Sequence, residues 1–329
     1  MSRLVVGECI VDLHPEGGEA GGHGDAGTYA RRPGGAPANV AAGLARLGEA
    51  PALWTRLGED GFGDFLAATL RGEGIPDTFV ERDPEAPTGL AVVALDADGD
   101  RSFSLYLDGT ASTRLEPGRI GDDALAAVDW LHVGGVELAH EPARSAVFDL
   151  LERAPEGVTV SFDPNARPSL WRAFDYGDTL ARALPDVDVL VASVEDLDPA
   201  GYEGTAEAVA SAVVADGPHT ALITRGAAGA YARSTADAPW GAGTAEHPGF
   251  DADVVDTTGA GDAFTAGAVD ALDGGADLAA ALRFGNAVGA RATTAQGAMA
   301  ALPTREQVEA FLDGVDGGTG GDRGDDDGE

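Results

Sequence analysis

Lysine is absent from this sequence: all 21 basic residues are arginine, and they stand against 56 acidic residues. The formal net charge at pH 7 is −35 over 329 residues. No basic cluster offsets the acids, which argues against nucleic acid as a partner. So large a charge is self-repelling in dilute buffer, but molar salt shortens the Debye length to about 3 Å and screens it. We therefore expect a cytoplasmic protein from a salt-accumulating halophile rather than an ordinary acidic protein.

Cysteine and long apolar runs are scarce as well. The single cysteine, Cys9, cannot form an intramolecular disulfide and suits a reducing compartment. No basic start followed by a long apolar segment indicates a signal peptide, and no window is apolar enough for a membrane span. The six histidines are scattered without the spacing of metal ligands. We expect a cytoplasmic location and no membrane partner.

Short apolar runs alternate with alanine-rich stretches along most of the chain. The apolar runs predict buried strands over residues 4–11, 52–56, 130–133, 158–162, 187–191 and 220–224. The intervening patterns predict helices over residues 38–47, 64–72, 142–153, 177–184, 205–215 and 278–294. Repeated strand–helix units imply an α/β fold with a parallel sheet covered on both faces.

Three segments depart from this alternation. Residues 90–95 and 102–106 flank Asp98-Gly99, a strong turn signal, and predict a β-hairpin. Residues 15–28 are rich in Gly, Glu and His and predict a loop. Residues 313–329 are rich in Gly and Asp, so we expect a disordered acidic tail that follows a domain over residues 1–312.

Residues 256–267 carry the most informative pattern, Asp-Thr-Thr-Gly-Ala-Gly-Asp-Ala-Phe-Thr-Ala-Gly. The glycines allow a tight turn, and the small residues from Ala263 onward continue as a helix. A helix N-terminus favours anions, because its N–H groups are free and the positive end of the dipole lies there. An acid beside an anion site would repel a bound phosphate unless it had a catalytic role. Asp262 can have such a role by taking a proton from a reacting hydroxyl. The segment predicts phosphoryl transfer to an alcohol; a plain strand-to-helix turn is the alternative.

A second glycine-rich segment, residues 34–41, reads Gly-Gly-Ala-Pro-Ala-Asn-Val-Ala. Paired glycines let a ligand approach the backbone closely. Asn39 can both donate to and accept from sugar hydroxyls. The alternative for Asn39 is a residue at a helix N-terminus that caps its neighbours.

Together these segments resemble the two signatures of the ribokinase-like family of carbohydrate kinases, also called the PfkB family. The first is matched at its defining positions and the second over residues 256–269; the defining positions of the first are Gly34, Gly35, Pro37, Asn39, Ala41, Gly48 and Gly58. The resemblance covers roughly residues 3–312. It implies a three-layer α/β/α sandwich with a mostly parallel central sheet. It also implies a small β-sheet lid, formed by residues 12–33 and 87–110, that closes over the sugar and excludes water.

The resemblance implies an ATP-dependent sugar kinase that forms a homodimer through this lid. Asp262 would be the catalytic base, beside an anion hole formed by Gly259, Ala260 and Gly261. The sugar would contact Asp12, Gly34, Gly35, Asn39, Tyr106, Arg167 and Asp262. ATP would contact Asn165, Ser193, Thr224, Gly226, Gly229, Gly259, Gly261 and Asn286.

Metal ions are implied in the same way. The family's magnesium element usually reads Asn-x-x-Glu, whereas the matching residues here are Ser193-Val-Glu-Asp196. Both defining positions differ, so we expect Asp196 to contact Mg²⁺ through water. Many members also bind a monovalent cation. The matching positions for potassium are Asp256, Thr258, Ala292, Ala295 and Gly297.

The choice of substrate is the least determined feature. Residues 162–171 resemble a segment shared by fructokinases and 2-keto-3-deoxygluconate kinases, and residues 132–146 look more like fructokinases. Both groups commonly place Arg after the lid Tyr, whereas Tyr106 is followed by Leu107-Asp108. A keto-acid carboxylate would then lack a bidentate partner and meet an acid. We expect fructose; a keto-acid, ribose or nucleoside kinase remains an alternative, as does a non-catalytic sugar sensor, against which Asp262 argues.

Overall fold

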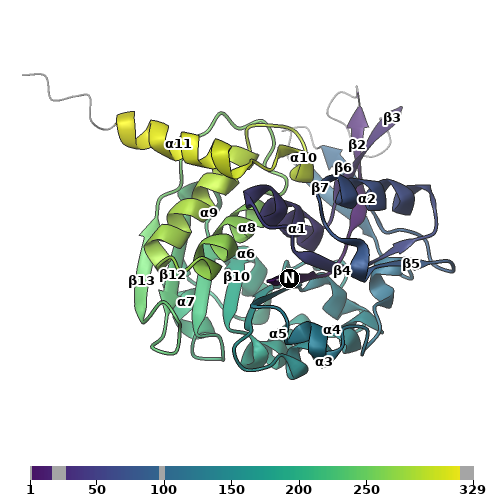
Figure 1. Cartoon of the computed structure of the whole chain (residues 1–329), viewed down its shortest axis with the longest axis horizontal. Helices are drawn as coiled ribbons and strands as arrows, with labels where there is room; N and C mark the ends of the chain where they lie inside the picture. The colour runs from purple at the N-terminus through teal and green to yellow at the C-terminus, as the bar shows by residue number, and fades with distance from the viewer. Residues whose placement is uncertain (1, 17–26, 96–100, 319–329) are drawn as a thin grey trace, which may run out of the picture.

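Two separate sheets organise the computed structural model, which describes residues 2–16, 27–95 and 101–318 (Figure 1). The larger sheet has nine strands in the order β13-β12-β11-β10-β9-β8-β1-β4-β5, and the smaller has four in the order β3-β2-β6-β7. None of the helices among these residues combines the length and apolar character needed to cross a membrane.

Seven neighbouring strands of the large sheet run parallel, and the hairpin β12–β13 adds an antiparallel edge beside β11. The nine strands of this sheet are mostly apolar at its centre, where both faces are covered. They are β1 (Arg3–Val6), β4 (Ala52–Gly58), β5 (Val80–Asp83), β8 (Trp130–Gly134), β9 (Thr159–Asp163), β10 (Val189–Ser193), β11 (Thr220–Thr224), β12 (Ala230–Ser234) and β13 (Gly243–His247).

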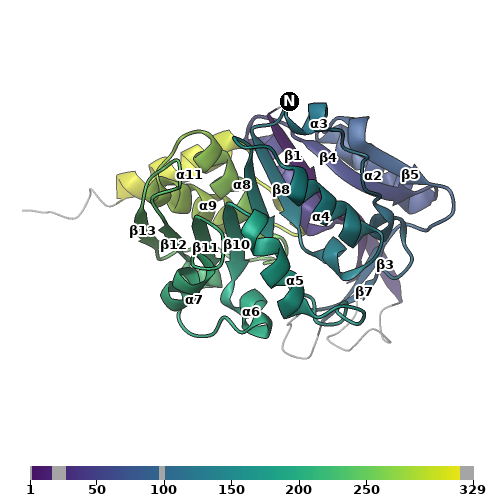
Figure 2. The ribbon, with the colours of Figure 1, turned by 90° about the horizontal axis from the view of Figure 1, so that it is seen from below.

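Helices cover the large sheet on both sides, which confirms the predicted α/β/α sandwich (Figure 2). One buried cluster joins Val5 of β1 to helices α1 (Ala36–Leu47), α2 (Gly61–Gly72), α8 (Ala260–Asp273) and α9 (Leu278–Ala292). The other joins Leu4 and Val6 to α3 (Asp122–Leu125), α4 (Ala143–Arg153), α5 (Tyr176–Ala183) and α7 (Ala206–Val213). This alternation is the period-2 pattern of a strand buried on both faces. The remaining helices are α6 (Val194–Leu197), α10 (Ala298–Ala301) and α11 (Arg305–Gly318).

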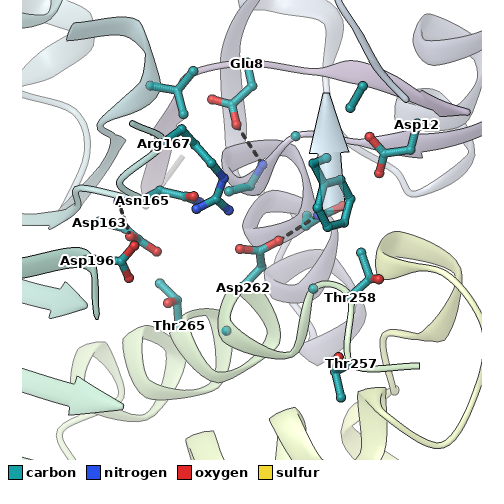
Figure 3. A pocket seen from close by; sticks show the side chains of 18 of the residues that line it. Glu8, Asp12, Asp163, Asn165, Arg167, Asp196, Thr257, Thr258, Asp262 and Thr265 are labelled. Atoms are coloured by element: carbon teal, nitrogen blue, oxygen red, sulfur yellow. Dashed lines mark hydrogen bonds between the residues drawn. The ribbon is translucent and has the colours of Figure 1, made fainter. Parts of the chain in front are cut away.

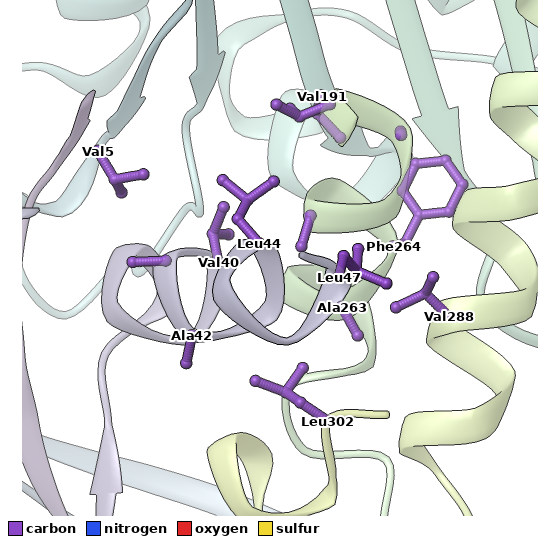
Figure 4. Packing of buried hydrophobic residues seen from close by; sticks show 14 of the residues in the cluster. Val5, Val40, Ala42, Leu44, Leu47, Val191, Ala263, Phe264, Val288 and Leu302 are labelled. Carbon is purple, nitrogen blue, oxygen red and sulfur yellow. The ribbon is translucent and has the colours of Figure 1, made fainter. Parts of the chain in front are cut away.

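Helices α1 and α8 pack closely against each other, with Val40 and Leu44 facing Ala263 and Phe264 (Figure 4). A Cβ at Gly43 would lie 2.7 Å from the Cβ of Ala266, so only glycine permits this approach. Since residues four apart share a helix face, the contact also brings together the residues one turn earlier, Asn39 and Asp262.

The small sheet comes from two distant segments of the chain. Its strands are β2 (Ile10–Glu16), β3 (Thr28–Gly34), β6 (Leu90–Leu95) and β7 (Arg101–Tyr106). β6 and β7 pair antiparallel, with Leu90 opposite Tyr106, as the hairpin prediction requires; the predicted turn at Asp98-Gly99 lies outside the described residues. The segments are joined by a parallel pairing of β2 and β6 over three residue pairs.

The sequence prediction of one strand over residues 4–11 is wrong. The run divides into β1 in the large sheet and β2 in the small sheet, and Cys9, expected inside a strand, lies buried in the connection. Gly7, at φ 148°, lies at the break. Apolar character predicts burial correctly but does not reveal that a chain changes sheets.

The boundary expected at residue 313, where we predicted a disordered tail to begin, falls inside a helix. α11 continues through Gly318, so residues 313–318 are helical. The helix is tied to the domain by a ring contact between Phe311 and Phe250 at 5.2 Å and by an ion pair between Arg283 and Asp316 at 2.7 Å. The rest of the predicted tail lies outside the described residues.

Candidate active site

A cavity of about 810 Å³ opens between the ends of the parallel strands and the small sheet (Figure 3). In doubly wound sheets the carboxyl ends of the strands are the usual ligand site. The lining includes thirteen of the predicted site residues: Asp12, Gly35, Asn39, Asn165, Arg167, Ser193, Asp196, Thr224, Asp256, Thr258, Gly259, Gly261 and Asp262.

Asp262 lies in the first turn of α8, as the sequence predicts. The preceding Gly259 adopts φ 77°, and a Cβ there would lie 2.7 Å from that of Ala298, so the turn requires glycine. In this structure the N–H of Ala260, a predicted anion-hole residue, donates to the carbonyl of Thr257 at 3.1 Å. Ala260 therefore supplies no free donor here, and the donors left for an anion are the N–H groups of the other residues of the turn.

The carboxylate of Asp262 accepts a hydrogen bond from the side-chain amide of Asn39 at 2.7 Å. Burial raises the pKa of Asp262 to about 6, against the opposing effects of Asn39 and the charge of Arg167. A carboxylate with a pKa near neutrality is suited to general-base work. The alternative role for Asn39, as a helix cap, is excluded because α1 begins at Ala36 without a side-chain cap.

Asp12 and the paired glycines form the wall beside Asn39. Burial, followed by the charges of Asp262 and Glu8, raises the pKa of Asp12 to about 7. A Cβ at Gly34 would lie 2.3 Å from the Asp12 carboxylate, and Gly35 adopts φ 98°. Asn39 Oδ1 is buried without a partner among the described residues, so it can accept a hydrogen bond from a ligand hydroxyl.

The small sheet supplies an apolar wall. Phe103, Leu105 and Leu107 line the cavity, whereas Tyr106 is 60% exposed and does not, because alternate residues of a strand face opposite sides. Tyr106, a predicted sugar contact, therefore lies outside the cavity lining in this structure. Asp108 also lies outside the lining and contacts His140 at 2.9 Å, so its predicted position in front of a substrate carboxylate is wrong.

Asp163 and Asp196 lie on the opposite side of Asp262 from Asp12 (Figure 3). Burial, and then the charges of Asp196 and Asp262, raise the pKa of Asp163 well above its ordinary value. Asp196 accepts from the Ser193 hydroxyl at 2.6 Å and from the N–H of Ala166 at 3.0 Å. Two carboxylates suit a hydrated Mg²⁺ that also binds phosphates. No group of three or more acidic, histidine or cysteine side chains able to hold a metal occurs within the described part of the chain.

Three predicted ATP contacts lie away from the cavity lining. Gly226 and Gly229 belong to the turn between β11 and β12, and Asn286 is buried in α9, where its amide donates to the Leu282 carbonyl at 2.7 Å. Of the neighbouring predicted residues, Thr224 does line the cavity.

The positions that match a potassium site come from two segments that Asp256 links. Its carboxylate accepts from the N–H of Thr258 at 2.9 Å and from that of Gly297 at 2.8 Å. Ala292 is the last residue of α9, and Ala295 lies exposed in the connection that follows.

Sequence reasoning missed several lining residues, notably Glu8, Asp163, Thr257 and Thr265. The signal for Glu8 is an acid in the middle of an otherwise apolar run, and burying an acid has a cost that needs a reason. Asp163 stands at the end of a buried strand, and the same argument applies.

An acid lies at the anion-binding end of a helix, and a small sheet lies over it. This arrangement places the chain in the class of α/β enzymes that transfer phosphoryl groups. Residues 2–305 match the model of the pfkB family of carbohydrate kinases, and the chain belongs to this family.

Three relatives illustrate the similarity. A fructokinase of Klebsiella pneumoniae is 38% identical over 318 residues, which cover 94% of this chain and 98% of the relative. The crystal structure of a Vibrio cholerae fructokinase with fructose, ADP and calcium ion is 34% identical, with a TM-score of 0.82 and coverage of 95% and 99%. The aminoimidazole riboside kinase of Salmonella enterica, solved with that riboside and an ATP analogue, is 30% identical, with a TM-score of 0.79 and coverage of 95% and 99%.

Proposed function

We propose that the protein transfers the γ-phosphoryl group of ATP to a hydroxyl of fructose. The observation that carries the proposal is Asp262, held by Asn39 at the N-terminus of α8. Asp262 takes the proton of the sugar hydroxyl while the hydroxyl oxygen forms a bond to the γ-phosphorus. The bond between that phosphorus and the β,γ-bridging oxygen breaks, and ADP leaves.

Each neighbouring group has a role in this step. The N–H groups of the α8 turn face the charge that develops on the transferred group. Arg167 is the sole arginine among the described residues that line the cavity, and it adds positive charge near Asp262. Mg²⁺, held by Asp163 and through water by Asp196, would supply charge neutralisation to the phosphates.

The charge of the cavity supports a neutral substrate. Six carboxyl groups line it, those of Glu8, Asp12, Asp163, Asp196, Asp256 and Asp262, against one arginine. A keto-acid would bring a further carboxylate into this field, whereas sugar hydroxyls can pair with Asp12 and Asn39. The riboside kinase among the relatives keeps a ribose or nucleoside substrate as the second candidate. A non-catalytic sensor would have no need of Asp262.

The deciding experiment is a coupled assay of ADP release over a panel of sugars, in molar KCl with Mg²⁺. We expect fructose to give the highest kcat/KM, with Asp262→Asn as the negative control. A higher value for ribose or a nucleoside would transfer the proposal to the second candidate. No turnover with any sugar, together with sugar binding detected by calorimetry, would favour the sensor.

Two further features belong to this proposal. Potassium would bind beside the α8 turn, near the two segments that Asp256 joins; replacing KCl by choline chloride of equal strength should then lower kcat. The homodimer would form through the small sheet, where Tyr106 exposes 60% of its surface away from the cavity. Light scattering after gel filtration, with Tyr106→Asp as the disrupting variant, tests it.

A further inference from the structure

Two buried glutamates that the proposed chemistry does not use lie next to each other in the sheet layer: Glu8 lines the cavity, and Glu137 follows the lining residue Val136. Glu8 follows β1, where the chain passes from the large sheet to the small one, and Glu137 lies in the 3₁₀ turn after β8. β1 and β8 are parallel neighbours, so both side chains leave the same edge of the sheet. Glu8 is 4% exposed and Glu137 2% exposed.

Close backbone approaches enclose the two carboxyl groups. A Cβ at Gly7 would lie 2.3 Å from Pro37 Cγ and 3.1 Å from Glu137 Oε2. A Cβ at Gly134 would lie 2.4 Å from the same Pro37 atom. Three chain segments therefore cross here at distances that only glycine permits, and the carboxyl groups have little room to separate.

One additional proton is needed to complete the hydrogen bonding of Glu8 and Glu137. Glu8 Oε1 accepts from the N–H of Ala36 at 2.9 Å. Glu8 Oε2 and Glu137 Oε2 are buried and have no donor among the described residues, yet the two carboxyl groups are within hydrogen-bonding reach of each other. A single proton on one carboxyl would satisfy both oxygens, because a protonated acid donates and its partner accepts.

The surroundings favour keeping that proton. The titratable groups that face Glu8 are Cys9 beside it, Asp12 on β2, Asp262 on α8, Asp163 on β9 and His132 on β8. Burial lowers the pKa of His132 to about 4, so this histidine brings no positive charge near neutral pH. Burial raises the pKa of Glu8 to about 7 and that of Glu137 well above its ordinary value. Buried acids without a cation neutralise one another by sharing a proton.

We propose that Glu8 and Glu137 share one proton and together position the sugar-binding end of α1. The bond from Ala36 to Glu8 anchors the first residue of this helix, directly after the cavity-lining Gly35. Asn39 lies one turn further and meets Asp262. Loss of the shared proton leaves two adjacent buried carboxylates, whose repulsion pulls Glu8 from Ala36. Both glutamates are positioning residues, and only the kinetic part of the test rests on the proposed function.

The kinetic test compares Glu137→Gln, Glu137→Ala and the exposed control Glu152→Gln, with fructose and saturating Mg-ATP between pH 7.5 and 9.5. The amide introduced by Glu137→Gln donates to Glu8 at every pH. The KM of this variant should therefore stay constant over the pH range in which the KM values of the unmodified protein and of the control rise. The alanine variant should raise KM about tenfold at pH 7.5 with kcat within about threefold. The proposal is overturned if the glutamine profile rises in parallel with that of the unmodified protein, or if alanine leaves KM unchanged.

A thermal test needs no substrate and covers the case of an alanine variant that does not fold. Asp12, Asp262 and Asp163 also have raised pKa values, but they are present in both the unmodified protein and Glu137→Gln, so the difference between the two melting profiles reports the proton of the pair. When a carboxyl group has a higher pKa in the folded protein than in the unfolded chain, the free energy of unfolding falls as the pH rises from the unfolded value towards the folded one. The melting temperature should therefore fall from pH 7.5 to 9.5 in the unmodified protein and much less in Glu137→Gln. Equal decreases in melting temperature in the two proteins would overturn the proposal that the glutamates share a proton. A flat glutamine profile without turnover on any sugar supports the pair and removes only the proposed function.

Discussion

The side-chain amide of Asn39 lies 2.7 Å from the carboxylate of Asp262, although 223 positions separate the two residues in the sequence. The hydrogen bond leaves Asn39 Oδ1 without a partner among the described residues. One amide thus orients the base and presents an acceptor to the substrate.

Replacing Asp262 by asparagine removes the base while keeping the size of the side chain. We expect kcat to fall by about 10²- to 10⁴-fold, with little change in ATP affinity. Steady-state kinetics with fructose and calorimetric titration of a non-hydrolysable ATP analogue measure the two effects. The exposed Asp313→Asn on α11 is the matched control; near-normal turnover in Asp262→Asn would remove the assignment.

Replacing Asn39 by alanine should shift the pH dependence of catalysis. Asp262 must be ionised to act as a base, so kcat/KM falls as pH drops through its pKa, about 6. The hydrogen bond from Asn39 lowers that pKa, and its loss should move the acidic limb of the profile to higher pH. A rise in KM without movement of the limb would mean that Asn39 contacts only the sugar.

Replacing Asp12 by asparagine should stabilise the protein at high pH. The folded state holds the proton of Asp12 up to about pH 7, whereas the unfolded chain loses it near the ordinary pKa of 3.8. The free energy of unfolding therefore falls between these values, and the neutral amide avoids this loss. Above pH 7 we expect a gain of up to roughly 4 kcal/mol, at about 1.4 kcal/mol per pKa unit.

Urea unfolding at pH 4 and pH 8 measures the gain in Asp12→Asn. The advantage of the variant should be nearly absent at pH 4. An equal effect at both values would assign it to packing rather than to charge.

Salt should stabilise the folded protein. With a net charge of −35, the repulsion among surface acids is screened as KCl rises from millimolar to molar concentration. Melting temperature and activity should both increase over this range. Sucrose at matched water activity controls for general osmolyte effects. A melting temperature that does not depend on KCl would contradict the halophilic interpretation.

The preference for a neutral sugar should amount to at least about tenfold in kcat/KM for fructose over 2-keto-3-deoxygluconate, or roughly 1.4 kcal/mol. The six carboxyl groups of the cavity cause this preference, since Asp108 pairs with His140 outside the lining. Asp108→Asn should therefore leave the ratio unchanged. Faster turnover of the keto-acid would overturn the fructokinase assignment.

Local patterns predicted most elements of this fold, because the central parallel strands are largely apolar and the helices between them are amphipathic; the polar parallel strand β5 was not predicted. The turn at Gly259 and the acid at Asp262 were also readable, since glycine, small residues and an acid in that order have few other uses. The meeting of Asn39 with Asp262 follows from the resemblance, and its physical cause is the close packing at Gly43.

Long-range placement could not be read from the sequence. Nothing near Asp108 indicates that His140 turns it away from the cavity. Nothing near Glu8 names Glu137 as its partner, because the pairing depends on which strands become neighbours. The change of sheet at Gly7 has the same origin, since an apolar run continues through it.

Asp12 stands at the seam of the small sheet, where β2 pairs with β6 through the residue pairs Val11 with Leu90, Asp12 with Ala91 and Leu13 with Val92. Each half of the sheet is otherwise a separate hairpin, β2 with β3 and β6 with β7. A hydroxyl that binds Asp12 therefore acts on the strand pairing that joins two hairpins from distant parts of the chain. Substrate binding by Asp12 and the connection between the two hairpins depend on the same three residue pairs.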